Sequence, residues 1–261
     1  MEGSEMMIVA FWSPVVGKAG TTNNIFTTSA RMALTQNKKV LLINSQYKSK
    51  DIETAIVPPN TSELLESVGI DCLLRNAKMR KISENSIRVS SLAYYGERLH
   101  IITGSTKKNE ELFETEMFDL FPMIVRGASQ YYDVVMVDVA SGTSKMSRMI
   151  LDVSDTVVVN LPQNKYLIEA CLKKCNELNK KIVYLIGNYD NKSIYNRKNL
   201  ERIFKQLKHK TVVIPHDVNL KDSFSDGIIK FLQKDVESKK YLFEEVEKVG
   251  CLILKGDKTS G

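Results

Sequence analysis

The sequence predicts an α/β fold, a doubly wound, mostly parallel sheet of about seven strands with helices on both faces. Short runs of β-branched and other apolar residues recur along the chain. Segments with apolar residues at helical spacing separate these runs, so strands are expected to alternate with helices. Most of the runs are continuous, which is typical of strands that helices cover on both faces. Such alternation indicates a parallel, doubly wound sheet.

The expected elements follow one another without a repeat or a linker between them. We therefore expect a single domain over residues 1–261, in which 241–261 form a C-terminal helix or tail. The expected strands are 7–11, 39–43, 99–102, 134–137, 156–160, 182–186 and 211–214. The expected helices are 24–36, 111–130, 165–179 and 198–207.

Composition and charge exclude few functions. The net charge of +6 is compatible with contact to nucleic acid or an anionic membrane, or simply with a solvated surface. The four cysteines form no CxxC pair and only three histidines are present. This favours reduced, structural thiols in a cytoplasmic protein over a metal site. No segment approaches the ~18–20 consecutive apolar residues of a membrane-spanning helix.

Residues 13–22, SPVVGKAGTT, follow the first expected strand and lead into a helix that begins at Thr21 or Thr22. In this arrangement, successive backbone N–H groups and the helix N-terminus face an anion such as a phosphate. The segment does not satisfy the phosphate-binding pattern GxxxxGK[ST], because it lacks the lysine. On spacing alone, the loop is either a phosphate site or a tight turn.

Five segments together resemble, in their order along the chain, the ParA/MinD family of deviant Walker A P-loop ATPases. They are the loop, VLLINSQ, YDVVMVDVASG, LIGN and VIPHDVNLKDSFSDG. The resemblance implies a P-loop NTPase-like fold that binds ATP and Mg²⁺. The atypical loop further resembles the TadZ-like branch, whose members act as polar localisation factors in pilus assembly.

This resemblance lays the family loop, KGGxGKTT, on residues 15–22. Val15 then replaces the signature lysine, which in the family reaches across a dimer, and Gly20 replaces the lysine that binds phosphate. Thr21 would hold Mg²⁺, and Thr22 would bond a phosphate. Lys18 points either at phosphate or at water. The loop residues expected to bind nucleotide are Val16, Gly17, Lys18, Ala19, Gly20, Thr21 and Thr22.

The missing lysines weaken hydrolysis more than binding. A charge-assisted hydrogen bond contributes roughly 1.5–3 kcal/mol, so one missing lysine lowers affinity by about 10–100-fold. Backbone, metal and base contacts remain. The same lysines stabilise charge that develops on the transferred phosphate. The resemblance therefore implies ATP binding with little or no hydrolysis.

Two further segments correspond to the family's residues around the metal and the attacking water. Asn44 and Gln46 stand where the family has two aspartates, and Gln46 is the catalytic candidate because an amide can orient a water. Asp138 would hold Mg²⁺ through water, and Gly142 would let the backbone move toward the γ-phosphate. Without the resemblance, these are polar residues at strand ends, and Asp138 is a cap or turn residue.

The residues expected to bind the base follow later strands. Asn188 stands in place of the asparagine that bonds adenine in the family, and Pro215 and Asp217 lie in the loop that frames the base. Ligands of doubly wound sheets bind outside the carboxyl ends of the strands, where these segments converge. The base pocket is therefore better preserved than the catalytic residues.

Three functions remain open on the sequence. We favour an ATP-binding switch that forms a nucleotide-dependent homodimer and positions a protein partner in a larger assembly, such as a pilus or secretion machine. It would be cytoplasmic, or peripheral at the membrane or cell pole. The second is an active ParA/MinD-type ATPase that partitions DNA or positions a membrane complex. The third is a ligase or a reductase on the same scaffold. A ligase would need the loop lysine and a reductase would need cysteines beside Asp138, and the sequence has neither.

The C-terminal segment has an apolar face at helical spacing, and Gly250 is expected to interrupt the helix. It loosely resembles the membrane-targeting tail of MinD-type members. Its polar face is acidic, however, whereas membrane-surface helices favour Lys and Arg. The segment is either such a tail, a partner site, or a final helix packed on the domain. The apolar face consists of Leu242, Phe243, Val246 and Val249.

Overall fold

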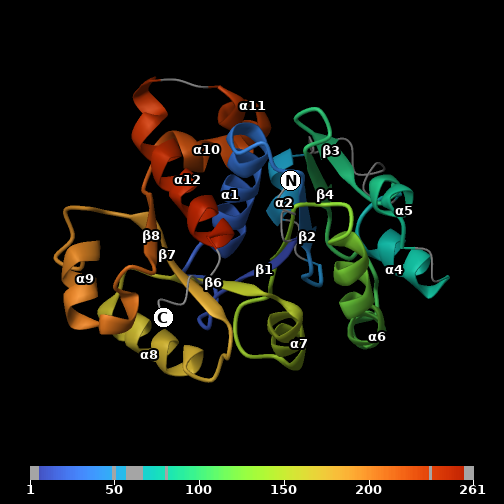
Figure 1. The fold of residues 1–261 in the computed structure, drawn as a ribbon, viewed down its shortest axis with the longest axis horizontal. Helices are drawn as coiled ribbons and strands as arrows, with labels where there is room; N and C mark the ends of the chain where they lie inside the picture. Colours follow the sequence, from blue (N-terminus) through green and yellow to red (C-terminus); the bar gives the residue numbers. More distant parts are fainter. Residues whose placement is uncertain (1–5, 49–50, 57–66, 80–81, 235–236, 256–261) are drawn as a thin grey trace.

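The computed structural model describes residues 6–48, 51–56, 67–79, 82–234 and 237–255. These residues form an eight-stranded sheet with the strand order β3-β4-β2-β5-β1-β6-β7-β8, and helices lie on both faces (Figure 1). Neighbouring strands are parallel, except that β3 runs antiparallel to β4. The doubly wound α/β fold is therefore confirmed.

Every expected strand is present, with small differences at the ends. The strands are β1 Met7–Trp12, β2 Val40–Asn44, β3 Leu92–Tyr94, β4 Leu99–Ile102, β5 Val134–Asp138, β6 Thr156–Leu161, β7 Lys181–Tyr189 and β8 Thr211–Pro215. The sequence does not predict β3, because its three residues are too few for a clear pattern and are only partly buried or exposed at the sheet edge.

The four expected helices are also present; the first begins three residues earlier than predicted, and the other three are shorter than predicted. The helices are α1 Thr21–Thr35, α2 Asp51–Ile56, α4 Ile70–Lys78, α5 Glu84–Val89, α6 Glu110–Ala128, α7 Lys145–Val153, α8 Lys165–Cys175, α9 Arg197–Ile203, α10 Val218–Asp226, α11 Ile228–Gln233 and α12 Lys240–Leu254. Short 3₁₀ turns are η2 Lys205–Leu207 and η3 Glu237–Lys239. The unpredicted helices have six to nine residues, too few for a clear periodic pattern.

Two apolar cores flank the sheet, and β1 contributes to both. Ile8, Ala10 and Trp12 belong to the core under α4 to α9. Val9 and Phe11 belong to the core under α1, α2, α10, α11 and α12. Because both faces of each central strand are buried, both alternating sets of side chains are apolar. This burial explains the continuous apolar runs of the sequence.

Helix α12 packs against α1 as an integral part of the fold, and the predicted interruption at Gly250 is wrong. A Cβ at Gly250 would lie 2.7 Å from Nε2 of Gln36, so glycine permits the close approach of the two helices. The Arg31 guanidinium lies 4.1 Å from the ring centre of Phe243 and pairs with Glu247. The apolar face of α12 is buried. Residues 256–261 of the expected tail lie outside the described residues.

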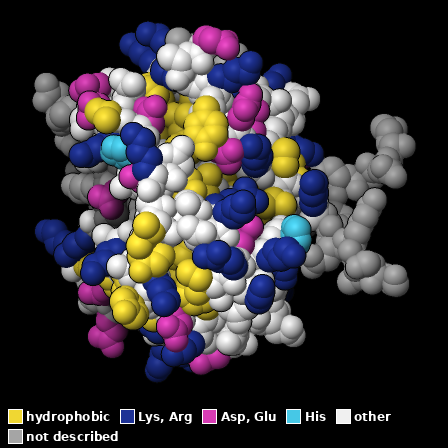
Figure 2. Space-filling view, turned by 90° about the vertical axis from the view of Figure 1, so that its left-hand side faces the viewer, with side chains coloured by type: hydrophobic (Ala, Val, Ile, Leu, Met, Phe, Trp, Pro, Cys, Tyr) yellow, Lys and Arg dark blue, Asp and Glu magenta, His cyan; other side chains and the backbone are white. Residues whose placement is uncertain are grey.

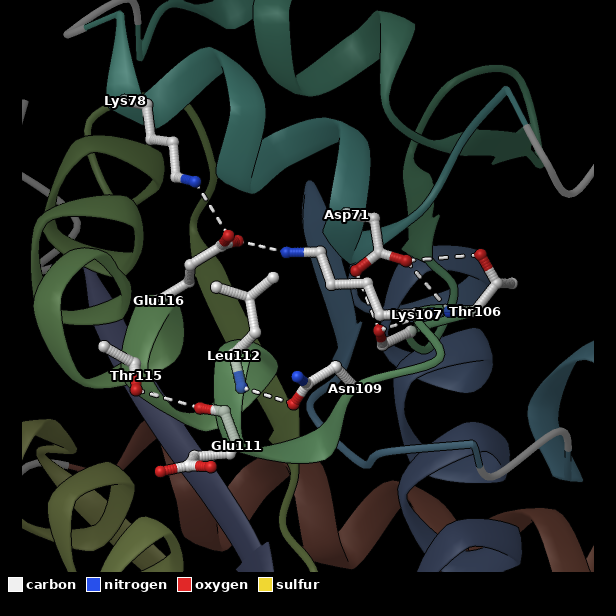
Figure 3. A network of polar contacts seen from close by, with 10 residues as sticks. Asp71, Lys78, Thr106, Lys107, Asn109, Glu111, Leu112, Thr115 and Glu116 are labelled. Carbon is white, nitrogen blue, oxygen red and sulfur yellow. Dashed lines mark hydrogen bonds and ion pairs between the residues drawn. The ribbon is translucent and has the colours of Figure 1, made fainter.

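Charged side chains hold the loop after β4 against α4 and α6 (Figure 3). Glu116 on α6 lies between Lys107 of this loop and Lys78, whose Nζ is 2.7 Å from Oε1. Burial alone would raise the pKa of Glu116, but hydrogen bonds from the two lysines lower it. At the start of α4, Asp71 accepts hydrogen bonds from the Ser105 hydroxyl and the Thr106 N–H. Within the described residues, no helix is long and apolar enough to cross a membrane.

Candidate functional site

Two adjoining cavities lie along the loop between β1 and α1. The first, of about 500 Å³, lies between this loop and residues that follow β2 and β5. The second, of about 340 Å³, shares residues 17–20 and extends to the segments after β7 and β8. The first is lined by Val16, Gly17, Lys18, Ala19, Gly20, Thr21, Thr22, Asn23, Gln46, Asp51, Ala140 and Ser141. The second includes Asn188, Pro215, His216 and Asp217.

The loop conformation suits an anion. Gly17 and Gly20 have φ angles of 70° and 63°, in the left-handed region that glycine adopts without strain. Helix α1 begins directly after Gly20, which makes no side-chain cap. The first-turn N–H groups are therefore available to an acceptor, and residues 21–23 line the first cavity. A helix start of this kind attracts negative charge.

Asp138 ends β5 and is buried behind Thr22 and Gln46, two residues that line the first cavity. Its Oδ2 accepts hydrogen bonds from the Thr22 hydroxyl at 2.8 Å and from Nε2 of Gln46 at 2.9 Å. Its Oδ1 is buried and has no hydrogen-bond partner among the described residues. Burial raises the pKa of this carboxyl to about 7, although both hydrogen bonds oppose the shift. The hydroxyl that bonds Asp138 belongs to Thr22. The resemblance of the loop to the family motif instead assigns the metal to Thr21.

This arrangement fits Mg²⁺. The hydroxyl of Thr22 and the carboxylate of Asp138 are oxygen donors, which Mg²⁺ prefers. The unpartnered oxygen of Asp138 is a buried charge that a cation would compensate. Among the described residues, no three His, Cys, Asp or Glu side chains form a metal-binding group. Mg²⁺ does not need one, since waters and phosphates usually complete its coordination.

The two amides after β2 have different surroundings. Gln46 lines the first cavity, and its role in orienting a water stays a prediction. Asn44 is fully buried, accepts from the Gln46 N–H at 3.1 Å and donates to Glu53 at 3.3 Å. Burial also raises the pKa of Glu53. Asn44 therefore supports the backbone of Gln46.

Sequence reasoning missed Asp51, which begins α2 and lines the first cavity beside Gln46. It adds a carboxylate to the cavity lining that also carries the amide of Gln46. Its charge raises the pKa of Asp138. Two effects on this pKa are larger: burial raises it, and the hydrogen bonds from Thr22 and Gln46 lower it. Asp51 follows β2 by several residues and is the first residue of a six-residue helix, so no spacing pattern identifies it.

Val15 and Val16 differ in exposure. Val15 is partly buried and packs against the core. Val16 is 72% exposed and lies at the wall of the first cavity. Lys18 is exposed and lines both cavities. Of the two valines, Val16 is therefore the one whose side chain projects from the loop.

The second cavity brings the predicted base-binding residues together. The register between β7 and β8 is interrupted between Ile186 and Tyr189, which places Asn188 outside the regular ladder. Its Oδ1 lies 2.6 Å from Nδ1 of His216. Asp217 accepts from the Leu220 N–H at 2.7 Å and caps α10. The sequence comparison missed His216, whose contact depends on this bulge.

Asn24 lines the second cavity and holds the loop between β1 and α1. Its Nδ2 donates to the carbonyl of Ala19 at 3.1 Å and to Oδ1 of Asn160 at 2.8 Å. A Cβ at Gly187 would lie 2.5 Å from the same Nδ2. The glycine before Asn188 is therefore required by close contact with α1. This buried link was not predicted from the sequence.

Comparison with known proteins identifies the fold. No protein-family model and no curated protein matches the sequence. A ParA family ATPase from Chlorobium tepidum TLS aligns with a TM-score of 0.72 and 14% identity, over 94% of this chain and 99% of that one. The septum site-determining protein MinD from Pyrococcus horikoshii OT3, complexed with Mg-ADP, gives 0.68 and 14%, over 98% and 97%. The chain has the ParA/MinD fold.

A third structure with this fold is a putative plasmid partition protein from Borrelia burgdorferi B31 bound to AMPPNP. It aligns with a TM-score of 0.62 and 18% identity, over 95% of this chain and 98% of that one. The alignments cover nearly the whole of each chain, so the ParA/MinD fold accounts for almost all of this sequence. At these identities the similarity establishes the fold, and the site chemistry rests on the residues described above.

Proposed function

We propose that this protein binds Mg²⁺-ATP between the loop 16–22 and the ends of β2 and β5. The observation that carries the proposal is the hydrogen bond from Thr22, which lines the first cavity, to the buried Asp138. In P-loop proteins a loop Ser or Thr and an Asp at a strand end hold Mg²⁺. Nucleotides in the MinD and plasmid partition structures support the same class of ligand.

The contact with Asp138 favours aligning the pattern GxxxxGK[ST] one residue later along the chain, so that its last position falls on Thr22 instead of Thr21. With Thr22 at the hydroxyl position, Gly20 takes the second glycine and Thr21 takes the lysine. The exposure of Val16 supports the same shift, since a lysine that reaches a partner must project from the loop. We therefore assign the metal to Thr22 and Asp138, with Thr21 on the wall beside them. Lys18, which lines both cavities, is the cation we place nearest the phosphates.

The base would occupy the second cavity. Asn188 and Asp217 offer polar groups there, and Pro215 ends the strand beside them. Phe224 adds an aromatic wall to the same cavity. The order of the two cavities along the loop matches a nucleotide whose phosphates lie over α1 and whose base lies between the ends of β7 and β8.

We further propose a role as a nucleotide-dependent positioning or partitioning protein. The aligned structures are a ParA ATPase, a division-site protein and a plasmid partition protein, which supports this alternative better than a pilus factor. A protein partner, a homodimer and a cytoplasmic location remain part of the proposal. Lysine, arginine and acidic side chains are interspersed on the face in Figure 2, so this face presents no single basic surface to DNA or membrane.

Hydrolysis is proposed to be slow. Neither Val16 nor Thr21 can supply the positive charge that a lysine brings to the transferred phosphate. Gln46 can orient a water, and Asp51 is the carboxylate beside it that would accept the proton. Each lost charge-stabilising contact lowers the rate by about 10²–10³, and such effects need not add.

Equilibrium titration with ATP, with Mg²⁺ and with EDTA, tests the proposal. Wild type should bind Mg²⁺-ATP, and Thr22→Ala should lose the gain in affinity that Mg²⁺ provides. Thr22→Ser should restore it. Thr35→Ala is the matched control, because Thr35 lies at the other end of α1 and bonds the Arg31 carbonyl. Absence of wild-type binding at millimolar nucleotide would overturn the proposal.

The same samples serve a phosphate-release assay. We expect turnover below the ordinary enzymatic range of about 1–10³ s⁻¹. Asp51→Asn should lower the residual rate and leave Mg²⁺-ATP affinity unchanged, since Asp51 would act on the water. A turnover within the ordinary range would contradict the assignment of a weakened site.

A further inference from the structure

Trp12 is the single tryptophan of the sequence and ends β1, four residues before the loop residues that line the first cavity. It is 2% exposed, and its ring belongs to the core under α4 to α9. Its indole Nε1–H donates to the carbonyl of Gly142 at 2.7 Å. This bond joins residues that are 130 positions apart in the chain.

Two backbone hydrogen bonds accompany the indole contact. The Gly142 N–H donates to the Ser13 carbonyl at 2.9 Å, and the Val139 N–H donates to the Phe11 carbonyl at 3.0 Å. Both polar groups of Gly142 are thus held by the end of β1 and the residue after it. Gly142 has φ 97°, a left-handed conformation that disfavours other residues.

These contacts determine where one wall of the first cavity stands. Ala140 and Ser141 line that wall, and they lie between the two residues held by β1. We propose that Trp12 is a positioning residue of the nucleotide site, whose indole N–H holds the segment 139–142 at the phosphate end. This inference rests on the proposed function and adds a residue to it.

A purely structural role for Trp12 predicts a different result. A packing residue would affect the whole molecule, including the base end of the site. The second cavity contains Asn188 and Pro215 but none of residues 139–142. Loss of the indole N–H should therefore weaken interactions of the outer phosphates and metal, and spare those of the nucleoside and first phosphate.

Trp12→Phe tests this distinction, because phenylalanine keeps an aromatic ring and removes the N–H. Loss of a typical hydrogen bond, about 0.5–1.5 kcal/mol, corresponds to a roughly 2–13-fold loss of Mg²⁺-ATP affinity. AMP affinity should stay at the wild-type value. Phe121→Leu is the control, since Phe121 is buried in the same core but its side chain has no hydrogen-bonding group that could hold segment 139–142.

Tryptophan fluorescence of the wild type provides a second measurement. All emission from tryptophan comes from Trp12, so Mg²⁺-ATP should change it and AMP should not. Gly142→Ala loosens the same contact from its other end while Trp12 remains. A Cβ there would lie 3.9 Å from Cγ2 of Val16, an ordinary contact, so the effect comes from the backbone conformation. This variant should show altered emission without nucleotide.

The outcomes separate the two proposals. If wild type binds no nucleotide, the proposed function fails, and this inference fails with it. If wild type binds but Trp12→Phe binds Mg²⁺-ATP equally well, the positioning role alone is overturned. Equal losses for Mg²⁺-ATP and AMP would show a purely structural effect and would also overturn it. If Trp12→Phe does not fold, fluorescence decides instead. Emission that is unchanged in Gly142→Ala, and unchanged when Mg²⁺-ATP is added to wild type, would overturn the positioning role.

Discussion

At the scale of single residues, Asp138 combines full burial with two donors on one oxygen and none on the other. Burial raises its pKa to about 7, from an ordinary value of 3.8. Between these values the folded protein holds a proton that the unfolded chain has released. The free energy of unfolding therefore falls as the pH rises through this window, and the cost of the buried charge is complete above about pH 7.

Asp138→Asn should remove this cost. Asparagine keeps an oxygen for the hydrogen bonds from Thr22 and Gln46, and it carries no charge. We expect the Mg²⁺-free variant to be more stable than wild type by roughly 4 kcal/mol at pH 8, with little difference at pH 4. Urea denaturation in EDTA measures this. Asp152→Asn, at an exposed position on α7, should show no such pH-dependent difference.

The buried histidine His100 does not affect the difference in stability between wild type and Asp138→Asn. Burial lowers the pKa of His100, so its contribution to stability is lost as the pH falls below about 6.5. This effect occurs in wild type and Asp138→Asn alike and cancels in their difference. An equal free energy of unfolding for both proteins at pH 8 would contradict the account of Asp138.

At the scale of elements, α12 is tied to α1, the helix that begins at the phosphate loop. Phe243 is 3% exposed and lies under the Arg31 guanidinium, while Arg31 also donates to the Leu232 carbonyl. The apolar face that would enter a membrane is the face that covers this core. Peripheral membrane binding through α12 would require the helix to leave the domain, and it stays a prediction without support from the packing.

Phe243→Ala should lower the free energy of unfolding by about 3–5 kcal/mol, because it leaves a cavity between α12 and α1. Tyr241→Ala on the same helix is the control. Tyr241 is 53% exposed, and its removal should change stability by less than about 0.5 kcal/mol. Chemical denaturation of both variants measures the difference. Similar small effects would mean that α12 is not part of the cooperative fold.

At the scale of the whole molecule, the first cavity opens beside the exposed Val16. A second copy that covers this opening would bury an apolar side chain and shield the bound phosphates from water. The valine brings no positive charge to the partner's nucleotide, so we expect the dimer to depend on Mg²⁺-ATP and to be weak. A nucleotide-dependent dimer is thus predicted at this face.

Light scattering after size-exclusion chromatography, with and without Mg²⁺-ATP, tests the dimer. Wild type should change from one chain to two on addition of nucleotide, and Val16→Glu should remain a monomer. Met79→Glu, at an exposed position after α4, should dimerise like wild type. A single-chain mass for wild type at a nucleotide concentration that saturates binding would contradict the prediction.

The sequence alone predicts the central strands, because burial on both faces requires apolar residues at successive positions. It also predicts the segments that meet at the site, since all of them follow strands of one parallel sheet. Short elements are not predicted in this way. The strand β3 and the helices α2 and α7 are too short for a periodic pattern, and Asp51 lies on one of them.

The tertiary structure alone decides which atoms meet. Thr21 and Thr22 are equivalent in the sequence, and the left-handed turn at Gly20 determines which hydroxyl lies against Asp138. Gly250 is a helix breaker by propensity, but close contact with Gln36 makes it part of α12. Trp12 meets Gly142 because β1 and β5 are neighbours in the sheet. Apolar patterning follows from burial of each strand, whereas these contacts depend on the distance and direction between residues far apart in the chain.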